Sequence, residues 1–330
     1  MRIAITGSTG FLGRHLVERL SNQHELVCIS RSGKAPEGCQ GKKVDIVKGR
    51  GLKSAFAKAD VVVHAAGMVD HRLARADETW AVHVTGTANV LDAAQSARVG
   101  KLIHLSTSGT IAVSKDSNFV GTEQSPTPDS IIASWPYYRS KLYSEQLVLD
   151  ADGLDAVCLN PSLLLGPGDD FGGASTHAVS VFLDHGVPFA PPGTVSFVDV
   201  RDVADAVERS IDRGRAGERY LLSSANMSFE EFYGRLARMS GGDRPVASMP
   251  SLTRKALGWF PGWGKANGIS AGWGPVISRE DLDLACHHWT ADSSKAIDEL
   301  GWSPRGPNET LEDTIYDLVE KKRSRFARFR

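Results

Sequence analysis

Residues 6–13 read TGSTGFLG, directly after the strand-like run RIAIT and directly before the helix-period stretch GRHLVERLS. Glycines at positions 7, 10 and 13 permit a tight turn, a close approach of backbone to a pyrophosphate and packing of the helix on the sheet. The helix N-terminus would then face the anion. A bare glycine pattern is a frequent false positive, but this one has the strand, turn and helix context that the motif requires. The stretch therefore predicts a dinucleotide site.

Further apolar runs alternate with helix-period stretches along the chain. ELVCIS, DVVVHAA, KLIHLS and DAVCLN are separated by segments such as TANVLDAAQSA, which is the pattern of a parallel sheet with crossover helices. Nearly continuous Val, Ile and Leu suit strands that are covered on both faces. We predict an α/β fold with a Rossmann-type, doubly wound parallel sheet and a smaller, interleaved C-terminal substrate-binding region.

The alternation breaks at about residue 166 into Gly- and Pro-rich loops, and it resumes with VSFVDV and the helix-period stretch DVADAVERSID. We therefore expect residues 1–165 to form the dinucleotide-binding domain, with 194–224 returning to it. Residues 166–193 and 225–330 are expected to form the substrate-binding region.

The composition is that of an ordinary globular protein. Of 330 residues, 41% are hydrophobic and 23% charged, and the net charge of -1 gives no strong basic field for nucleic acid. No signal-peptide pattern opens the chain and no apolar stretch reaches membrane-spanning length, so we expect a cytoplasmic protein without membrane insertion. The basic end KKRSRFARFR is interpreted as a solvated helix end, which leaves weak contact with an anionic surface open.

The cysteines and histidines predict no metal site. Cys28, Cys39, Cys158 and Cys286 lack metal-ligand spacing, and we expect free thiols and no disulfides. The adjacent pair at residues 287–288 has no third histidine or cysteine at a recognisable spacing.

The second strand-like run ends in CISRSGK, where an acid would normally hold the ribose 2′-hydroxyl. Ser30 stands at the place of the acid, and Arg31 follows it. A guanidinium with neighbouring hydroxyls suits a 2′-phosphate. The sequence therefore favours NADP(H), with NAD(H) possible.

The stretch SWPYYRSKLYSEQ at residues 134–146 pairs Tyr137 with Lys141, four positions later on the same helix face. Tyr138 and Tyr143 have leucines at that offset. A nearby ammonium favours a phenolate and would let Tyr137 act as an acid or base near neutral pH. The same spacing is also typical of a lysine that merely covers apolar surface.

Additional motifs occur in the order found in one enzyme family. With them the chain resembles the extended short-chain dehydrogenases/reductases of the NAD-dependent epimerase/dehydratase family, a branch that holds dihydroflavonol reductases, 3β-hydroxysteroid dehydrogenases and nucleotide-sugar epimerases. The likeness covers nearly the whole chain. The motifs are HAAG at 64–67, HVTGTANVLDAA at 83–94, LSTSGT at 105–110, LNPSLLLGPGD at 159–169, SFVDVRDVADA at 196–206 and DSSKAIDELGWSPR at 292–305.

The resemblance implies that Ser108 hydrogen-bonds the substrate oxygen, that Tyr137 exchanges its proton, and that Lys141 lowers the tyrosine pKa and holds the nicotinamide ribose. It also makes a homodimer possible. The glycine turn, the end of the second strand-like run and the family resemblance together predict which residues contact the cofactor. These are Gly7, Thr9, Gly10, Phe11, Leu12, Gly13, Arg31, Ser32, Asp45, Ile46, His64, Ala65, Ala66, Gly67, Ser106, Tyr137, Lys141, Pro161 and Ser162.

Two positions depart from the family pattern. His83 stands where an asparagine usually precedes VxGT, which puts any role of that amide in doubt. Dehydratases of the branch carry a Thr, Asp, Glu run where this chain has STSG, so we do not expect dehydration. Glu145, four residues after Lys141, is expected to form at most a surface salt bridge.

The leading hypothesis is an NADP-dependent oxidoreductase that reduces an apolar ketone or aldehyde to an alcohol, or the reverse. We expect Leu163 to Leu165, Phe171, Phe189 and Phe197 to bound an apolar pocket without basic residues. The tryptophan-rich segment at 257–273 is interpreted either as packing or as pocket lining.

Two alternatives remain. A nucleotide-sugar epimerase would use NAD and would carry an arginine just before the VDV strand, where this chain has Ser196 and Phe197. A non-catalytic dinucleotide sensor would typically lose the Tyr and Lys that this chain keeps.

Overall fold

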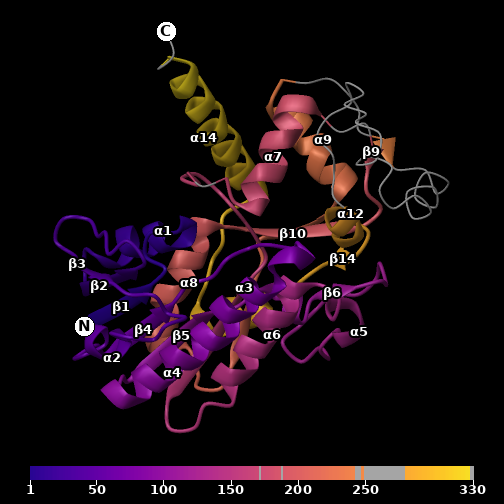
Figure 1. The fold of residues 1–330 in the computed structure, drawn as a ribbon. Helices are drawn as coiled ribbons and strands as arrows, with labels where there is room; N and C mark the ends of the chain where they lie inside the picture. Colours follow the sequence, from indigo (N-terminus) through magenta and orange to yellow (C-terminus); the bar gives the residue numbers. More distant parts are fainter. Residues whose placement is uncertain (171, 187–188, 242–246, 249–278, 328–330) are drawn as a thin grey trace.

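A computed structural model describes residues 1–170, 172–186, 189–241, 247–248 and 279–327 (Figure 1). Its main sheet has seven strands in the order β11-β7-β5-β4-β1-β2-β3, all parallel. The order reverses between β1 and β4, where doubly wound sheets open a crevice for ligands. The predicted Rossmann-type sheet is confirmed. The strands are β1 Arg2–Thr6, β2 Glu25–Ser30, β3 Gln40–Lys43, β4 Val61–His64, β5 Lys101–Leu105, β7 Asp155–Pro161 and β11 Arg219–Leu222.

Helices cover both faces of this sheet. Ile3 and Ile5 of β1 point into one core with α1 and α8, whereas Ala4 between them points into the other core with α2 and α4. Burial on both sides explains the continuous apolar runs of these strands. The helices around the sheet are α1 Phe11–Leu20, α2 Leu52–Ala55, α3 Ala76–Trp80, α4 Gly86–Ala97, α5 Asp129–Ile132, α6 Pro136–Leu149, α8 Val200–Arg213 and α13 Ser294–Leu300, with short turns η1 Leu73–Arg75, η2 Ala81–Thr85 and η3 Ser108–Thr110.

A smaller lobe surrounds a second sheet of order β12-β10-β8, whose own core lies under three helices (Figure 1). Its strands are β8 Leu163–Leu165, β10 Thr194–Asp199 and β12 Ala225–Ser228, and its helices are α7 Ala174–His185, α9 Phe229–Met239 and α14 Pro307–Ala327. The remaining elements are α12 Arg279–Ala285 and two strand pairs, β9 Phe189–Ala190 with β13 Ala247–Ser248 and β6 Val113–Ser114 with β14 His288–Trp289.

The chain passes back and forth between the two sheets. Of the segment 194–224, which is predicted to return to the first domain, α8 and β11 join the large sheet, but β10 pairs with β8 and β12 in the small one. The predicted domain boundaries otherwise stay predictions.

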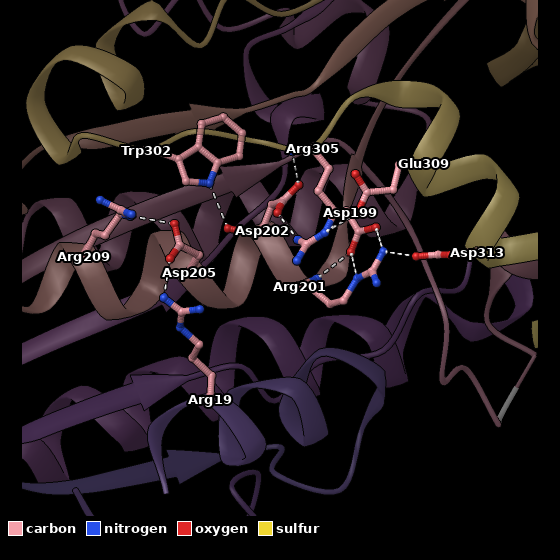
Figure 2. Close-up of polar contacts among 10 residues, drawn as sticks. All are labelled: Arg19, Asp199, Arg201, Asp202, Asp205, Arg209, Trp302, Arg305, Glu309 and Asp313. Atoms are coloured by element: carbon pink, nitrogen blue, oxygen red, sulfur yellow. Dashed lines mark hydrogen bonds and ion pairs between the residues drawn. The ribbon is translucent and has the colours of Figure 1, made fainter. Parts of the chain in front are cut away.

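A polar network fixes the segment after α13 to the start of α8 (Figure 2). The indole N–H of Trp302 donates to the backbone carbonyl of Asp202 over 2.8 Å. Arg201 lies 2.7 Å from the buried N-cap residue Asp199 and 2.6 Å from Asp313 of α14. Arg305 pairs with Asp202 and Glu309, and a separate group nearby joins Asp205 to Arg19 and Arg209.

All four cysteines have free thiols. Within the described parts of the chain, none of the helices combines the length and apolarity needed to cross a membrane.

Candidate active site

The glycine turn leaves no space for side chains. Gly7 has a φ of +74°, and a Cβ there would lie 2.7 Å from the backbone of Ala66. A Cβ on Gly13 would lie 2.0 Å from the carbonyl oxygen of Gly7. Gly10 is the N-cap of α1 and supplies no side-chain hydrogen bond, so the first N–H groups, beginning at Phe11 and Leu12, can meet an anion. This turn fits a dinucleotide pyrophosphate.

The ends of β2 and β3 lie side by side, because Ser30 pairs in register with Lys43. The Ser30 hydroxyl accepts the Gly33 N–H over 3.0 Å and lies 3.1 Å from the Ser32 hydroxyl. Arg31 is exposed and forms no hydrogen bond or ion pair with the residues that the structure describes. Its guanidinium is therefore available to a ligand.

Asp45 and Ile46 follow β3 on the same edge of the sheet. Asp45 accepts the Val47 N–H over 3.0 Å, and Ile46 packs against Gly86, where a Cβ would come within 2.7 Å of Ile46 Cδ1. At the far side, Ser162 follows β7 and donates to the Leu222 carbonyl over 3.1 Å. These predicted contacts thus lie at the carboxyl edge of the sheet.

The His64 ring serves the core rather than the crevice. Its Nδ1 lies 2.7 Å from the Thr6 hydroxyl and its Nε2 lies 3.0 Å from the Thr87 hydroxyl. Burial, and then the charge of Lys141, lower the pKa of His64 to about 3. Its neutral ring therefore holds strand to helix, and the backbone that follows, at 65–66, runs beside Gly7.

Tyr137 and Lys141 lie one turn apart on α6, as predicted, and both are buried. The Lys141 ammonium lies 2.6 Å from the carbonyl oxygen of Leu105. Burial raises the pKa of Tyr137 to about 12, and a hydrogen bond with the Thr107 side chain offsets part of that rise. The expected depression of the tyrosine pKa by Lys141 is therefore not found, because desolvation of the phenolate dominates.

Sequence reasoning missed Thr107. Its side chain meets the phenol of Tyr137, whereas the adjacent Ser108 hydroxyl has no hydrogen-bond partner among the described residues. The family resemblance pointed to Ser108 alone. The only sequence feature that could have indicated Thr107 is its own hydroxyl, next to Ser108 in STSG.

Glu145 is wholly buried, with 0% of its surface exposed, so the expected surface salt bridge is wrong. Its Oε2 accepts hydrogen bonds from Asn160 over 2.7 Å, from Thr110 over 3.0 Å and from the Ser106 hydroxyl. Its Oε1 accepts from Arg219 over 3.0 Å. The carboxylate thus fixes both ends of the turn that carries Thr107 and Ser108. The Ser106 hydroxyl, predicted to face the cofactor, is engaged here.

Aromatic rings flank the Tyr137 phenol. The His71 ring stands edge-on to Tyr137 at 5.4 Å and stacks on Tyr138 at 5.6 Å. Tyr138 packs over Gly109, where a Cβ would lie 2.3 Å from its ring, and Trp289 lies 5.0 Å beyond. The surroundings are thus mainly apolar.

The predicted pocket lining is partly wrong. Leu165 and Phe197 are fully buried in the core of the smaller lobe and cannot face a substrate. Phe171, the side chain of Phe189 and the tryptophan-rich segment 257–273 lie outside the described residues.

Comparisons with known proteins agree with this geometry. The model of the "NAD dependent epimerase/dehydratase family" matches residues 3–223. A putative dihydroflavonol 4-reductase of Synechocystis is 25% identical over 94% of this chain and 93% of its own. Sterol demethylase protein B of Methylococcus capsulatus is 27% identical over 96% and 97% of the two chains. UDP-glucose 4-epimerase of Thermus thermophilus, solved with NAD, superposes with a TM-score of 0.74 and 22% identity over 97% and 99%, a likeness of fold.

Proposed function

The chain belongs to the NAD dependent epimerase/dehydratase family and is an NAD(P)-dependent enzyme of the extended short-chain dehydrogenase/reductase type, and we propose that it reduces an apolar, aromatic or alicyclic ketone or aldehyde with NADP(H), or runs the reverse reaction. The observation that carries this proposal is the buried pair of Tyr137 and Lys141 on α6, with the Thr107 side chain hydrogen-bonded to the phenol and Ser108 next to Thr107 in the chain. The aromatic surroundings of the phenol support an apolar substrate.

NADPH, when bound, supplies the hydride that reduces the carbonyl carbon. Tyr137 donates its phenolic proton to the oxygen of that carbonyl, while the Ser108 hydroxyl hydrogen-bonds the same oxygen. Thr107 holds the phenol in place. Lys141, whose ammonium reaches the end of β5, holds the ribose.

The preference for NADP(H) is supported by Arg31. It is exposed, unpaired among the described residues and adjacent to the Ser30 and Ser32 hydroxyls, where a 2′-phosphate would accept several donors. The family description names NAD, which remains the alternative.

A homodimer is supported by an apolar surface on α3 and α6. Tyr143 is 47% exposed and its ring lies 5.0 Å from that of Trp80, with Leu147 exposed one turn further on. A second copy of the chain would cover this surface. Light scattering on the purified protein tests it, and Leu147→Glu should give monomers if the contact is correct.

A substrate panel tests the proposed reaction against epimerisation. Cyclic, aromatic and β-keto carbonyls are offered with NADPH, and UDP- and TDP-sugars with NAD. The proposal expects oxidation of NADPH with at least one carbonyl. Epimerisation of a sugar nucleotide without any carbonyl reduction would establish the rival. The arginine expected of an epimerase has no equivalent here, since Ser196 bonds Ser223 over 2.6 Å and Phe197 is core.

A further inference from the structure

His83 lies in the π-helical turn η2 between α3 and α4, and only 1% of its surface is exposed. Single π turns inside helices often mark functional sites. The ring stands edge-on to the Tyr137 ring at a centroid distance of 5.5 Å. The residue that departs from the family's usual asparagine thus contacts the proposed acid.

The hydrogen bonds of His83 fix its tautomer. The Met68 backbone N–H donates to Nε2 over 3.2 Å, so Nε2 is unprotonated and the ring hydrogen sits on Nδ1. That N–H donates to the Ser140 hydroxyl over 2.8 Å, and the hydroxyl donates in turn to the carbonyl oxygen of Tyr137 over 2.8 Å. Three hydrogen bonds, all donating in the same direction, therefore link the backbone N–H of Met68 to the backbone carbonyl of Tyr137 through His83 and Ser140.

Only the neutral ring fits this chain. Burial first, and then the charge of Lys141, lower the pKa of His83 well below its ordinary value. A second ring proton would sit on Nε2 and point at the Met68 N–H. Two donors would then face each other, and the hydrogen bond would be lost. The other titratable groups around it are Tyr137 on α6 and the neutral rings of His64 and His104 on β4 and β5.

His83 and Lys141 both approach Gly67. A Cβ on Gly67 would lie 3.2 Å from His83 Nε2 and 3.7 Å from Lys141 Nζ. The stretch 64–67 is predicted to line the cofactor. At Gly67, its last residue, the imidazole and the proposed catalytic lysine therefore leave no space for a larger side chain.

We propose that His83, as the neutral Nδ1–H tautomer, is a positioning residue that sets the separation between the segment 65–68, which includes the predicted cofactor contacts 65–67, and the first turn of α6. It acts on the backbone of Tyr137 through Ser140, and on the segment through the Met68 N–H. Its importance for turnover rests on the proposed function of Tyr137, whereas its structural role does not.

Two amide replacements separate the two hydrogen bonds. An asparagine amide reaches the place of the imidazole Nδ1 and can donate to Ser140, but it is too short to reach the Met68 N–H. A glutamine amide reaches the place of Nε2 and can accept from Met68, but it has no donor at the place of Nδ1. His83→Phe removes both bonds, Ser140→Ala breaks the chain at its middle, and Ser144→Ala is the matched control. Ser144 makes the same type of bond one turn later, to the Lys141 carbonyl over 2.9 Å.

The experiment combines hydrogen–deuterium exchange, ¹⁵N-histidine NMR, NADPH titration and turnover on the full chain. We expect His83→Gln to speed exchange at least fivefold in the first turn of α6 only, His83→Asn to do so in 65–68 only, and His83→Phe to do both. The NMR spectrum should show the Nδ1–H tautomer, unchanged between pH 6 and pH 9, and Ser144→Ala should match wild type within about twofold.

Other results would overturn the proposal. One is an Nε2–H tautomer or an imidazolium at neutral pH, and another is unchanged exchange in both segments of a folded His83→Phe variant. Loss of turnover in His83→Gln beyond that in Ser144→Ala, at saturating NADPH, is expected with any carbonyl that the substrate panel identifies. If the panel identifies none, exchange and NMR still decide the positioning role, and the failure then belongs to the proposed reaction.

Discussion

Lys141 donates a hydrogen bond to the carbonyl oxygen of Leu105 over 2.6 Å, and this ammonium stands at the end of β5 rather than in a pair with the Tyr137 phenol. The contact orders the lysine before any ligand arrives. It also means that the tyrosine and the lysine, although one helical turn apart, are held by different groups: Tyr137 by Thr107, and Lys141 by the sheet. Mutations should therefore separate the contribution of Tyr137 to turnover from the contribution of Lys141 to cofactor binding.

Tyr137→Phe should lower kcat at least about a hundredfold and leave the NADPH dissociation constant within a few-fold, because it deletes only the proton donor. Tyr138→Phe is the matched control, since that ring packs over Gly109 beside the site, and its effect should be mild. Steady-state kinetics and NADPH titration check both. Equal losses in the two variants would contradict the assignment of Tyr137.

Thr107 and Ser108 should give different pH profiles. The hydrogen bond from Thr107 lowers the pKa of Tyr137. Alcohol oxidation needs the phenolate and its rate rises with pH, so Thr107→Val should move this rising limb of the profile to higher pH. Ser108→Ala should lower kcat by about a hundredfold without moving that limb, since it removes a donor to the substrate oxygen. Profiles measured between pH 6 and 11 distinguish the two roles. A shift of the limb in Ser108→Ala but not in Thr107→Val would mean that Ser108 bonds the phenol and Thr107 bonds the substrate oxygen.

NADPH affinity should fall as the pH rises above 8. Burial lowers the pKa of Lys141 to about 8, so in the ligand-free protein the ammonium loses its proton in this range. If the protonated lysine holds the ribose, affinity is present below pH 8 and is lost above it, by up to about tenfold per pH unit. Lys141→Met should bind weakly with no such slope, whereas the exposed Lys53→Met should match wild type. Fluorescence titrations at pH 7 and 9.5 measure this.

Arg31→Asp should erase or reverse a preference for NADPH over NADH. Losing a charge-assisted contact to the 2′-phosphate costs about 1.5 to 3 kcal/mol. Arg238→Asp, an exposed arginine on α9 in the other lobe, controls for the change in net charge. Binding of both cofactors is titrated in each variant, and equal affinities for them in the wild type would show that Arg31 faces only water.

Breaking the buried pair of Glu145 and Arg219 should destabilise the fold. Arg219→Leu leaves a buried carboxylate unpaired and should cost about 3 to 5 kcal/mol of unfolding free energy. In the double variant with Glu145→Leu the loss should be smaller than the sum of the single losses, because the orphaned charge is gone. Arg235→Leu, at the exposed pair with Glu231, should cost about 0 to 1 kcal/mol. Urea unfolding measures all four, and strict additivity would contradict the coupling.

Local patterns in the sequence were sufficient for the fold and for the helix on which Tyr137 and Lys141 lie one turn apart. The parallel sheet follows from the alternation of apolar runs and helices, and the helix that carries Tyr137 and Lys141 follows from spacing alone. Both signals lie within a few residues, where the periodicity of a single element decides the structure.

Features that depend on distant parts of the chain could not be predicted. Glu145 looks solvent-exposed on its helix, yet it is buried by Arg219, 74 positions away. Phe197 and Leu165 look like pocket residues because they flank loops, but pairing of β8 with β10 turns them into a separate core. Thr107 and Ser108 are adjacent hydroxyls, and only the shape of the turn decides which one meets the phenol.

The return of β11 to the edge of the large sheet limits which segments of this protein can be exchanged with those of its relatives. Residues 219–222 pair with β7, while 194–199 and 225–228, just before and after, belong to the other sheet. No single cut in the chain therefore separates the large sheet from the smaller lobe. Exchange of substrate specificity between relatives must proceed by replacing loops within a fixed scaffold, since a transplanted half would leave β7 as a bare edge open to aggregation.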